Sequence, residues 1–116
     1  MKPALTALLL LVACASAGPR PAADESSSDR AIARTEEQKA EELERTLSAL
    51  SAAEVPPDCP RICGLVEQIC ELSQRICAIS GRQRDDPDLA ARCAAGEQRC
   101  RRSRDRVPPA CSCQVR

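Results

Sequence analysis

The sequence predicts an all-α protein: a small disulfide-stapled antiparallel helical hairpin with an additional N-terminal amphipathic helix, in a three-helix arrangement. Three observations predict this fold. Apolar residues recur at helical spacing in three segments, and prolines separate these segments. No segment of the 116 residues alternates between apolar and polar residues as a strand does. Nine cysteines are present, and several are spaced seven residues apart, which places them on one helical face.

Residues 1–13 are predicted to be a signal peptide. A short positive start, Met1-Lys2, precedes an apolar run over 4–12, and small residues follow up to Gly18. The apolar run is shorter than the roughly 20 residues that a membrane-spanning helix needs. We therefore expect the chain to be exported and the mature chain not to span a membrane.

The end of this apolar run forms a four-residue motif, Leu11-Val12-Ala13-Cys14. It resembles the lipobox of bacterial lipoprotein precursors. The resemblance implies cleavage before Cys14, lipidation of its sulfur and attachment to a membrane, with Ala15 favouring the outer membrane. Removing Cys14 from the count leaves eight cysteines, an even number that can pair completely.

Residues 14–29 are predicted to form the lipidated Cys and a flexible tether. The segment after Cys14 is rich in Pro and Ser and has no apolar periodicity. At roughly 3.3 Å per residue it would hold a domain up to about 50 Å from the membrane. The alternative is cleavage behind small residues 15–17, which would release a soluble secreted protein beginning at Gly18.

Residues 30–116 are predicted to form a cysteine-rich helical domain. Its first helix, over about 30–53, has a thin apolar stripe at Ala40, Leu43, Leu47 and Leu50. A capping box at Thr35 is an alternative start, and Pro56-Pro57 ends the segment. We expect this helix to dock on the second; a free-standing first helix, which leaves the apolar seam of the second exposed, is the alternative.

The second helix is predicted over 60–80, with Pro60 in its first turn and Gly81 as its C-cap. Its aliphatic seam consists of Ile62, Leu65, Ile69, Leu72, Ile76 and Ile79. A second seam beside it consists of Cys63, Val66, Cys70, Ser73 and Cys77. The third helix is predicted over 87–105, with Asp86 as N-cap and a stripe of Leu89, Cys93, Gly96, Cys100 and Ser103.

The cysteine spacing predicts a disulfide ladder, because facing residues of an antiparallel hairpin have a constant sum of residue numbers. That sum is 170 for Cys77 with Cys93, for Cys70 with Cys100, and for Cys59 with Cys111. It is 176 for Cys63 with Cys113, a deviation that the non-helical tail can absorb. Small residues between the cysteines let the helices approach as closely as a disulfide requires.

Two functional alternatives for these cysteines remain open. Thiolates along one helical face can bind Cu(I) or Zn(II), so metal sequestration is one alternative. A redox role at Cys111 and Cys113 is the other, because neighbouring arginines would lower the thiol pKa. The absence of His and the single Met favour structural disulfides, with no metal and no cofactor.

The net charge is zero, but the charge is unevenly distributed. Segment 24–58 carries a net −6 and segment 59–116 a net +4. A candidate binding patch for an anionic envelope component or a protein partner consists of Arg99, Arg101, Arg102, Arg104 and Arg106. The alternative is that the acidic first helix neutralises these arginines within the same molecule.

Composition excludes several functions. Without aromatic residues there is no stacking platform for nucleic acid, and without His there is no Ser-His-Asp set. The signal segment and the cysteines on helices resemble small cysteine-rich envelope lipoproteins, a resemblance that implies no particular activity. The sequence therefore predicts a non-enzymatic, extracytoplasmic protein with a structural or binding role, with no catalytic residues and no nucleic-acid partner.

Overall fold

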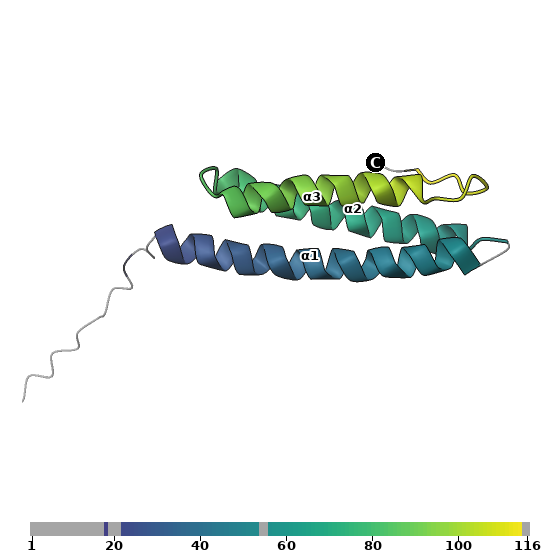
Figure 1. The fold of residues 1–116 in the computed structure, drawn as a ribbon, viewed down its shortest axis with the longest axis horizontal. Helices are drawn as coiled ribbons and strands as arrows, with labels where there is room; N and C mark the ends of the chain where they lie inside the picture. Colours follow the sequence, from purple (N-terminus) through teal and green to yellow (C-terminus); the bar gives the residue numbers. More distant parts are fainter. Residues whose placement is uncertain (1–17, 19–21, 54–55, 115–116) are drawn as a thin grey trace, which may run out of the picture.

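The computed structural model describes residues 18, 22–53 and 56–114. Its helices are α1 (Ala22–Ala53), α2 (Cys59–Arg82) and α3 (Pro87–Asp105), and the described part of the chain contains no strand. Figure 1 shows α1 and α3 running in the same direction, with α2 antiparallel to both. The predicted all-α fold, a hairpin preceded by another helix, is confirmed.

The ends of α2 are set by local signals. The carboxylate of Asp58 accepts a hydrogen bond from the backbone N–H of Arg61, and a proline lies in the first turn. The helix runs through Gly81 and ends at Arg82, where Gln83 follows with φ −119°. The predicted C-cap at Gly81 is therefore wrong, because the chain leaves the helix without a left-handed residue.

The third helix has the predicted bounds. Asp86 is its N-cap and accepts hydrogen bonds from the backbone N–H groups of Asp88 and Leu89, at 3.0 and 3.2 Å. Pro87 occupies the first helical position, where a missing N–H costs nothing. Residues 106–114 follow as an irregular tail.

The first helix begins at Ala22, eight residues before the predicted start. Residues 22–29 are therefore helical, and the predicted tether is wrong over this part. The cause is a tertiary contact: Ser26 and Arg30 both donate hydrogen bonds to the carboxylate of Asp86, at 2.8 and 2.7 Å. These bonds fix the first turns of α1 against the turn between α2 and α3.

The alternative start of α1 at Thr35 is also wrong. Thr35 lies inside the helix, and its hydroxyl donates to the carbonyl of Ala31 at 3.1 Å. Cys14 and the predicted signal peptide lie outside the described residues. Whether the chain is lipidated therefore stays a prediction.

The first helix docks on α2, as expected. Leu47 is fully buried among Ile62, Leu65, Val66 and Ile69, and a second cluster gathers around Ala33 near the other end of the bundle. All six residues of the aliphatic seam of α2 are buried. The alternative of a free-standing first helix is therefore wrong.

The second seam of α2 faces α3 at short range. A Cβ added at Gly96 of α3 would lie 2.9 Å from Oγ of Ser73 and 3.4 Å from its Cα. Ser103 and Val66, the next pair of residues predicted to face each other along the two helices, are both fully buried. The small residues thus permit the close approach that the sequence predicts.

Candidate functional site

Four disulfides join α2 to α3 and to the tail. They pair Cys59 with Cys111, Cys63 with Cys113, Cys70 with Cys100, and Cys77 with Cys93. These are the pairs that the residue-number sums predict, and their Cα–Cα distances run from 4.6 to 5.3 Å. Four disulfides indicate an oxidising, extracytoplasmic environment.

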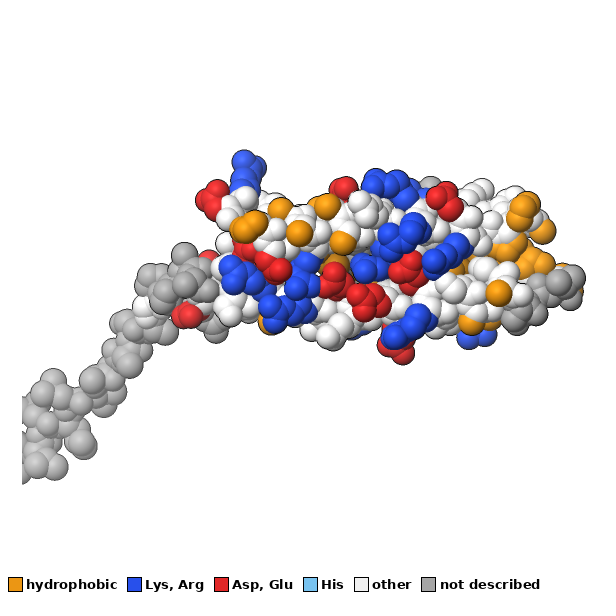
Figure 2. All heavy atoms as spheres, in the orientation of Figure 1, with side chains coloured by type: hydrophobic (Ala, Val, Ile, Leu, Met, Phe, Trp, Pro, Cys, Tyr) orange, Lys and Arg blue, Asp and Glu red, His pale blue; other side chains and the backbone are white. Residues whose placement is uncertain are grey.

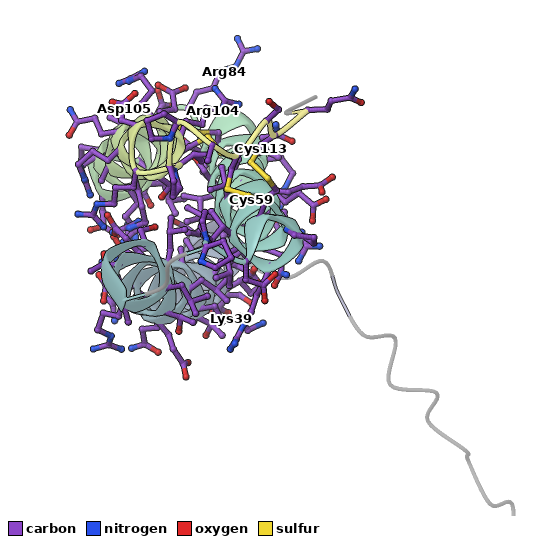
Figure 3. The ribbon with its side chains drawn as sticks, turned by 90° about the vertical axis from the view of Figure 1, so that its right-hand side faces the viewer. Lys39, Cys59, Arg84, Arg104, Asp105 and Cys113 are labelled. Carbon is purple, nitrogen blue, oxygen red and sulfur yellow. A yellow bond between two sulfur atoms is a disulfide. The ribbon has the colours of Figure 1, made fainter. Side chains whose placement is uncertain are left out.

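The two tail cysteines are bonded to α2 and not to each other. Figure 3 looks along the bundle and shows the sulfur–sulfur bonds beside the labelled Cys59 and Cys113. Cys111 and Cys113 therefore stand in separate disulfides, and the structure does not form the redox pair considered from the sequence.

The candidate patch of five arginines is divided between two environments. Arg99, Arg102 and Arg106 point to α1, where each has a nitrogen 3.3 to 3.5 Å from a carboxylate oxygen of Glu44. Figure 2 shows blue and red side chains intermingled where α1 and α3 meet. The acidic first helix thus pairs with these three arginines within the molecule and offsets part of their positive charge.

Arg101 and Arg104 differ from those three. Both are exposed, and neither forms an ion pair with any residue in 22–53 or 56–114. Arg102 and Arg106 remain half exposed, with 50% and 41% of their side chains accessible. The exposed positive charge of α3 therefore centres on two arginines with two more at its edge.

Arg99 is the buried member of the set, with 9% of its side chain exposed. Its nearest counter-charges are Glu44 at 3.3 Å and Glu41 at 3.6 Å. Nε lies 3.3 Å from Glu44 but makes no hydrogen bond to it, and neither Nε nor Nη1, both buried, is hydrogen-bonded within the described part of the chain. A buried cation with so few acceptors depends on the charge of Glu44.

Substitution Glu44→Gln is expected to lower the free energy of unfolding by about 1–3 kcal/mol, because it leaves the buried Arg99 without its nearest counter-charge. Urea denaturation measures the change. Glu41→Gln is the matched control: its side chain is 55% exposed, and we expect an effect within about 0.5 kcal/mol. Equal effects of the two variants would contradict the role given to Glu44.

A second charged cluster lies nearer the beginning of α3. Arg92 forms ion pairs with Asp88, at 3.0 Å, and with Glu37 of α1. The hydrogen bond to Asp88, together with the negative charge of Glu37, raises the pKa of the Arg92 guanidinium. This cluster continues the polar boundary between α1 and α3.

Asp86 joins the beginning of α1 to the beginning of α3. Hydrogen bonds from Ser26, from Arg30 and from the backbone of Leu89, together with the positive charge of Arg30, lower its pKa from the ordinary 3.8 to about 2. Ionised Asp86 therefore stabilises the end of the bundle at which α1 begins.

This carboxylate gives a pH prediction. Because its pKa is lower in the folded state, its stabilisation is complete above about pH 4 and is lost as the pH falls toward 2. A carbon-13 NMR titration is expected to give a midpoint near 2. Asp86→Asn keeps a good N-cap but no charge, so it is expected to remove this part of the acid dependence. An unchanged acid dependence in Asp86→Asn would contradict the assignment.

The described residues hold one group of potential metal ligands. Sγ of Cys77, Sγ of Cys93 and a carboxylate oxygen of Glu97 lie within 4.8 Å of one another. In the oxidised form both sulfurs belong to the disulfide. Glu97 is not among the site residues predicted from the sequence; its position four residues after Cys93, on the same helical face, is the signal that points to it.

The grooves between the helices are open and largely lined by charged side chains. The groove between α1 and α2 combines Leu43 and Leu72 with Lys39, Glu71 and Arg75. None of the described helices is long and apolar enough to cross a membrane.

No protein-family model, curated protein or solved structure matches the chain. Its function is therefore argued from its own residues.

Proposed function

We propose that the chain is a non-catalytic envelope lipoprotein whose stapled bundle is a rigid module with a binding surface on α3. The observation that carries the proposal is the disulfide ladder. Two bonds lock α2 to α3, and two more fix the tail to the beginning of α2. Such cross-linking restricts the relative motion of α2, α3 and the tail. It therefore suits a rigid binding surface better than an active site that must open and close.

The position of α1 supports a spacer role. Seven residues separate Cys14 from Ala22, so a lipid on Cys14 would keep the beginning of α1 within roughly 25 Å of the membrane. The 32 residues of α1 extend over about 48 Å. The tail lies toward the opposite end of the bundle from Ala22 (Figure 1) and would be held farther from the membrane.

Lipid attachment is tested by metabolic labelling of the full chain in a bacterial host with an alkyne-tagged fatty acid. We expect the label to enter the wild-type chain and the protein to sediment with membranes. Cys14→Ser is expected to lose both. Labelling of Cys14→Ser, or wild-type protein that stays unlabelled and in the soluble fraction, would exclude the lipoprotein assignment.

The binding surface is proposed for an anionic envelope component or an acidic protein partner. It consists of Arg101 and Arg104, with Arg102 and Arg106 at its edge. Vesicles that contain phosphatidylglycerol, and poly-glutamate as an acidic polypeptide, are the two probes. We expect at least one probe to bind, and we expect added salt to weaken this binding because dissolved ions screen the interaction between exposed charges.

Two matched double variants distinguish binding at this surface from a general effect of the protein's positive charge. Arg101→Gln/Arg104→Gln is expected to lose most of the binding, whereas Arg34→Gln/Arg45→Gln removes the same charge from exposed positions of α1 and is expected to keep it. Equal losses in both variants, or no binding of either probe, would refute the surface.

A further inference from the structure

The Cys77–Cys93 disulfide has a neighbour that the other three lack. A carboxylate oxygen of Glu97 lies 3.9 Å from Sγ of Cys77, and the three possible ligand atoms fall within 4.8 Å of one another. No second group of this kind occurs in the described part of the chain. The ligands come from two facing helices, which fixes their relative positions.

This disulfide is accessible from the surface. Cys77 and Cys93 are both partly exposed, as are Cys63 and Cys113, whereas Cys70 and Cys100 of the next bond are 4% and 8% exposed. The two cysteines are 16 residues apart in sequence, against 30, 50 and 52 for the other pairs. Because Cys77–Cys93 is the innermost bond of the ladder, opening it leaves the other three bonds in place and α2 still joined to α3 at Cys70–Cys100.

The next bond keeps the two cysteines together after reduction. Cys70–Cys100 lies seven residues away on each helix, and the Cα atoms of Cys77 and Cys93 are 4.6 Å apart. Zinc–sulfur bonds of about 2.3 Å at tetrahedral angles place two sulfurs roughly 3.8 Å apart. Rotation of the two side chains provides that separation without movement of the helices.

We propose that reduction of Cys77–Cys93 creates a Zn²⁺ site made of the two thiolates and the carboxylate of Glu97. A dithiol reductant transfers two electrons, the sulfur–sulfur bond breaks, and the reductant leaves as a disulfide. Zn²⁺ then binds both sulfurs with release of their two protons, and Glu97 supplies the third ligand. A fourth position stays open to water or to another ligand, as three protein ligands allow.

The donor set favours Zn²⁺ over Cu(I). Cu(I) prefers sulfur ligands alone, and the third ligand here is a carboxylate oxygen. Zn²⁺ accepts both sulfur and oxygen ligands. Its charge of +2 offsets most of the negative charge of the two thiolates and the carboxylate. The proposal is independent of lipid attachment and of the arginine surface, since it concerns neither.

The test uses the oxidised wild-type protein and a titration with dithiothreitol, with alkylation and peptide mass mapping to identify the bond that opens. We expect Cys77–Cys93 to open before the buried Cys70–Cys100, and native mass spectrometry to find one Zn²⁺ per chain in which Cys77–Cys93 is open. Co²⁺ in place of Zn²⁺ is expected to give thiolate-to-metal charge-transfer absorption. Opening of Cys70–Cys100 before Cys77–Cys93, or no retained metal once Cys77–Cys93 is open, would overturn the proposal.

Two variants test the ligands. Glu97→Gln is expected to weaken Zn²⁺ binding at least tenfold while leaving the order of reduction unchanged, and Glu71→Gln, an exposed glutamate of α2, is the matched control. Cys77→Ala/Cys93→Ala keeps the other three disulfides and is expected to bind no Zn²⁺ under the same conditions. Stoichiometric binding by that variant, or unchanged affinity in Glu97→Gln, would assign the metal to other residues.

Discussion

Replacement of Cys70 and Cys100 together by Ala is expected to lower the free energy of unfolding by about 2–4 kcal/mol. This bond lies in the middle of the hairpin, closes a loop between residues 30 apart in sequence, and both of its cysteines are buried. Its loss leaves Cys77–Cys93 as the one disulfide that joins α2 directly to α3. Urea denaturation under oxidising conditions measures the effect.

The single variant Cys70→Ala tests the pairing itself. We expect one free thiol, at Cys100, with the other three disulfides intact. The intact mass of the oxidised wild-type protein is expected to lie about 8 Da below that of the reduced chain, as four disulfides require. Alkylation of any other cysteine in Cys70→Ala would show that the pairing between the helices is different.

Replacement of Leu47 by Ala is expected to lower the free energy of unfolding by about 2–5 kcal/mol, the usual range for a large-to-small change in a core. Leu47 is fully buried between α1 and α2. Because α1 contains no cysteine, its attachment is non-covalent, and a cavity at this point weakens the docking directly.

Hydrogen exchange locates the effect of this variant. We expect amides of α1 to lose protection while those of α2 and α3 keep it, since the disulfides hold the hairpin. Ile32→Ala is the matched control on the same helix, because Ile32 is 47% exposed, and its effect is expected to stay within about 0.5 kcal/mol. A uniform loss of protection over all helices would contradict independent release of α1.

The sequence predicts α2 and α3 to within two residues at each end because their boundaries depend on local chemistry. Asp58 and Asp86 act as N-caps, and a proline follows each in the first turn. The beginning of α1 has only a weaker local signal, the acidic Asp24 and Glu25 in its first turn. It is stabilised by Asp86, some 56 residues away along the chain, so local propensity could not reveal it.

Three of the cysteine pairs were predictable because an antiparallel hairpin imposes one register on them, and the irregular tail absorbs the departure of Cys63–Cys113 from that register. The environment of the arginines was not, because both a free patch and an internally neutralised one agree with the same composition. The choice depends on which face of α3 meets α1. The face of α3 that meets α1 places Arg99 beside Glu44. Arg101 and Arg104 lie on the remaining surface of α3, exposed to solvent.

The bonds from the tail to the beginning of α2 also determine how the molecule responds to tension. When the chain is pulled at its two ends, force that arrives at Cys59 passes through the sulfur–sulfur bond to Cys111 and leaves through the tail. Cys63–Cys113 adds a parallel path through the first turn of α2, and the residues between Cys63 and Cys111 lie outside both covalent paths and cannot be drawn out. Extension is confined to α1 and the segments beside it, so the module lengthens by peeling α1 away while the hairpin keeps its shape.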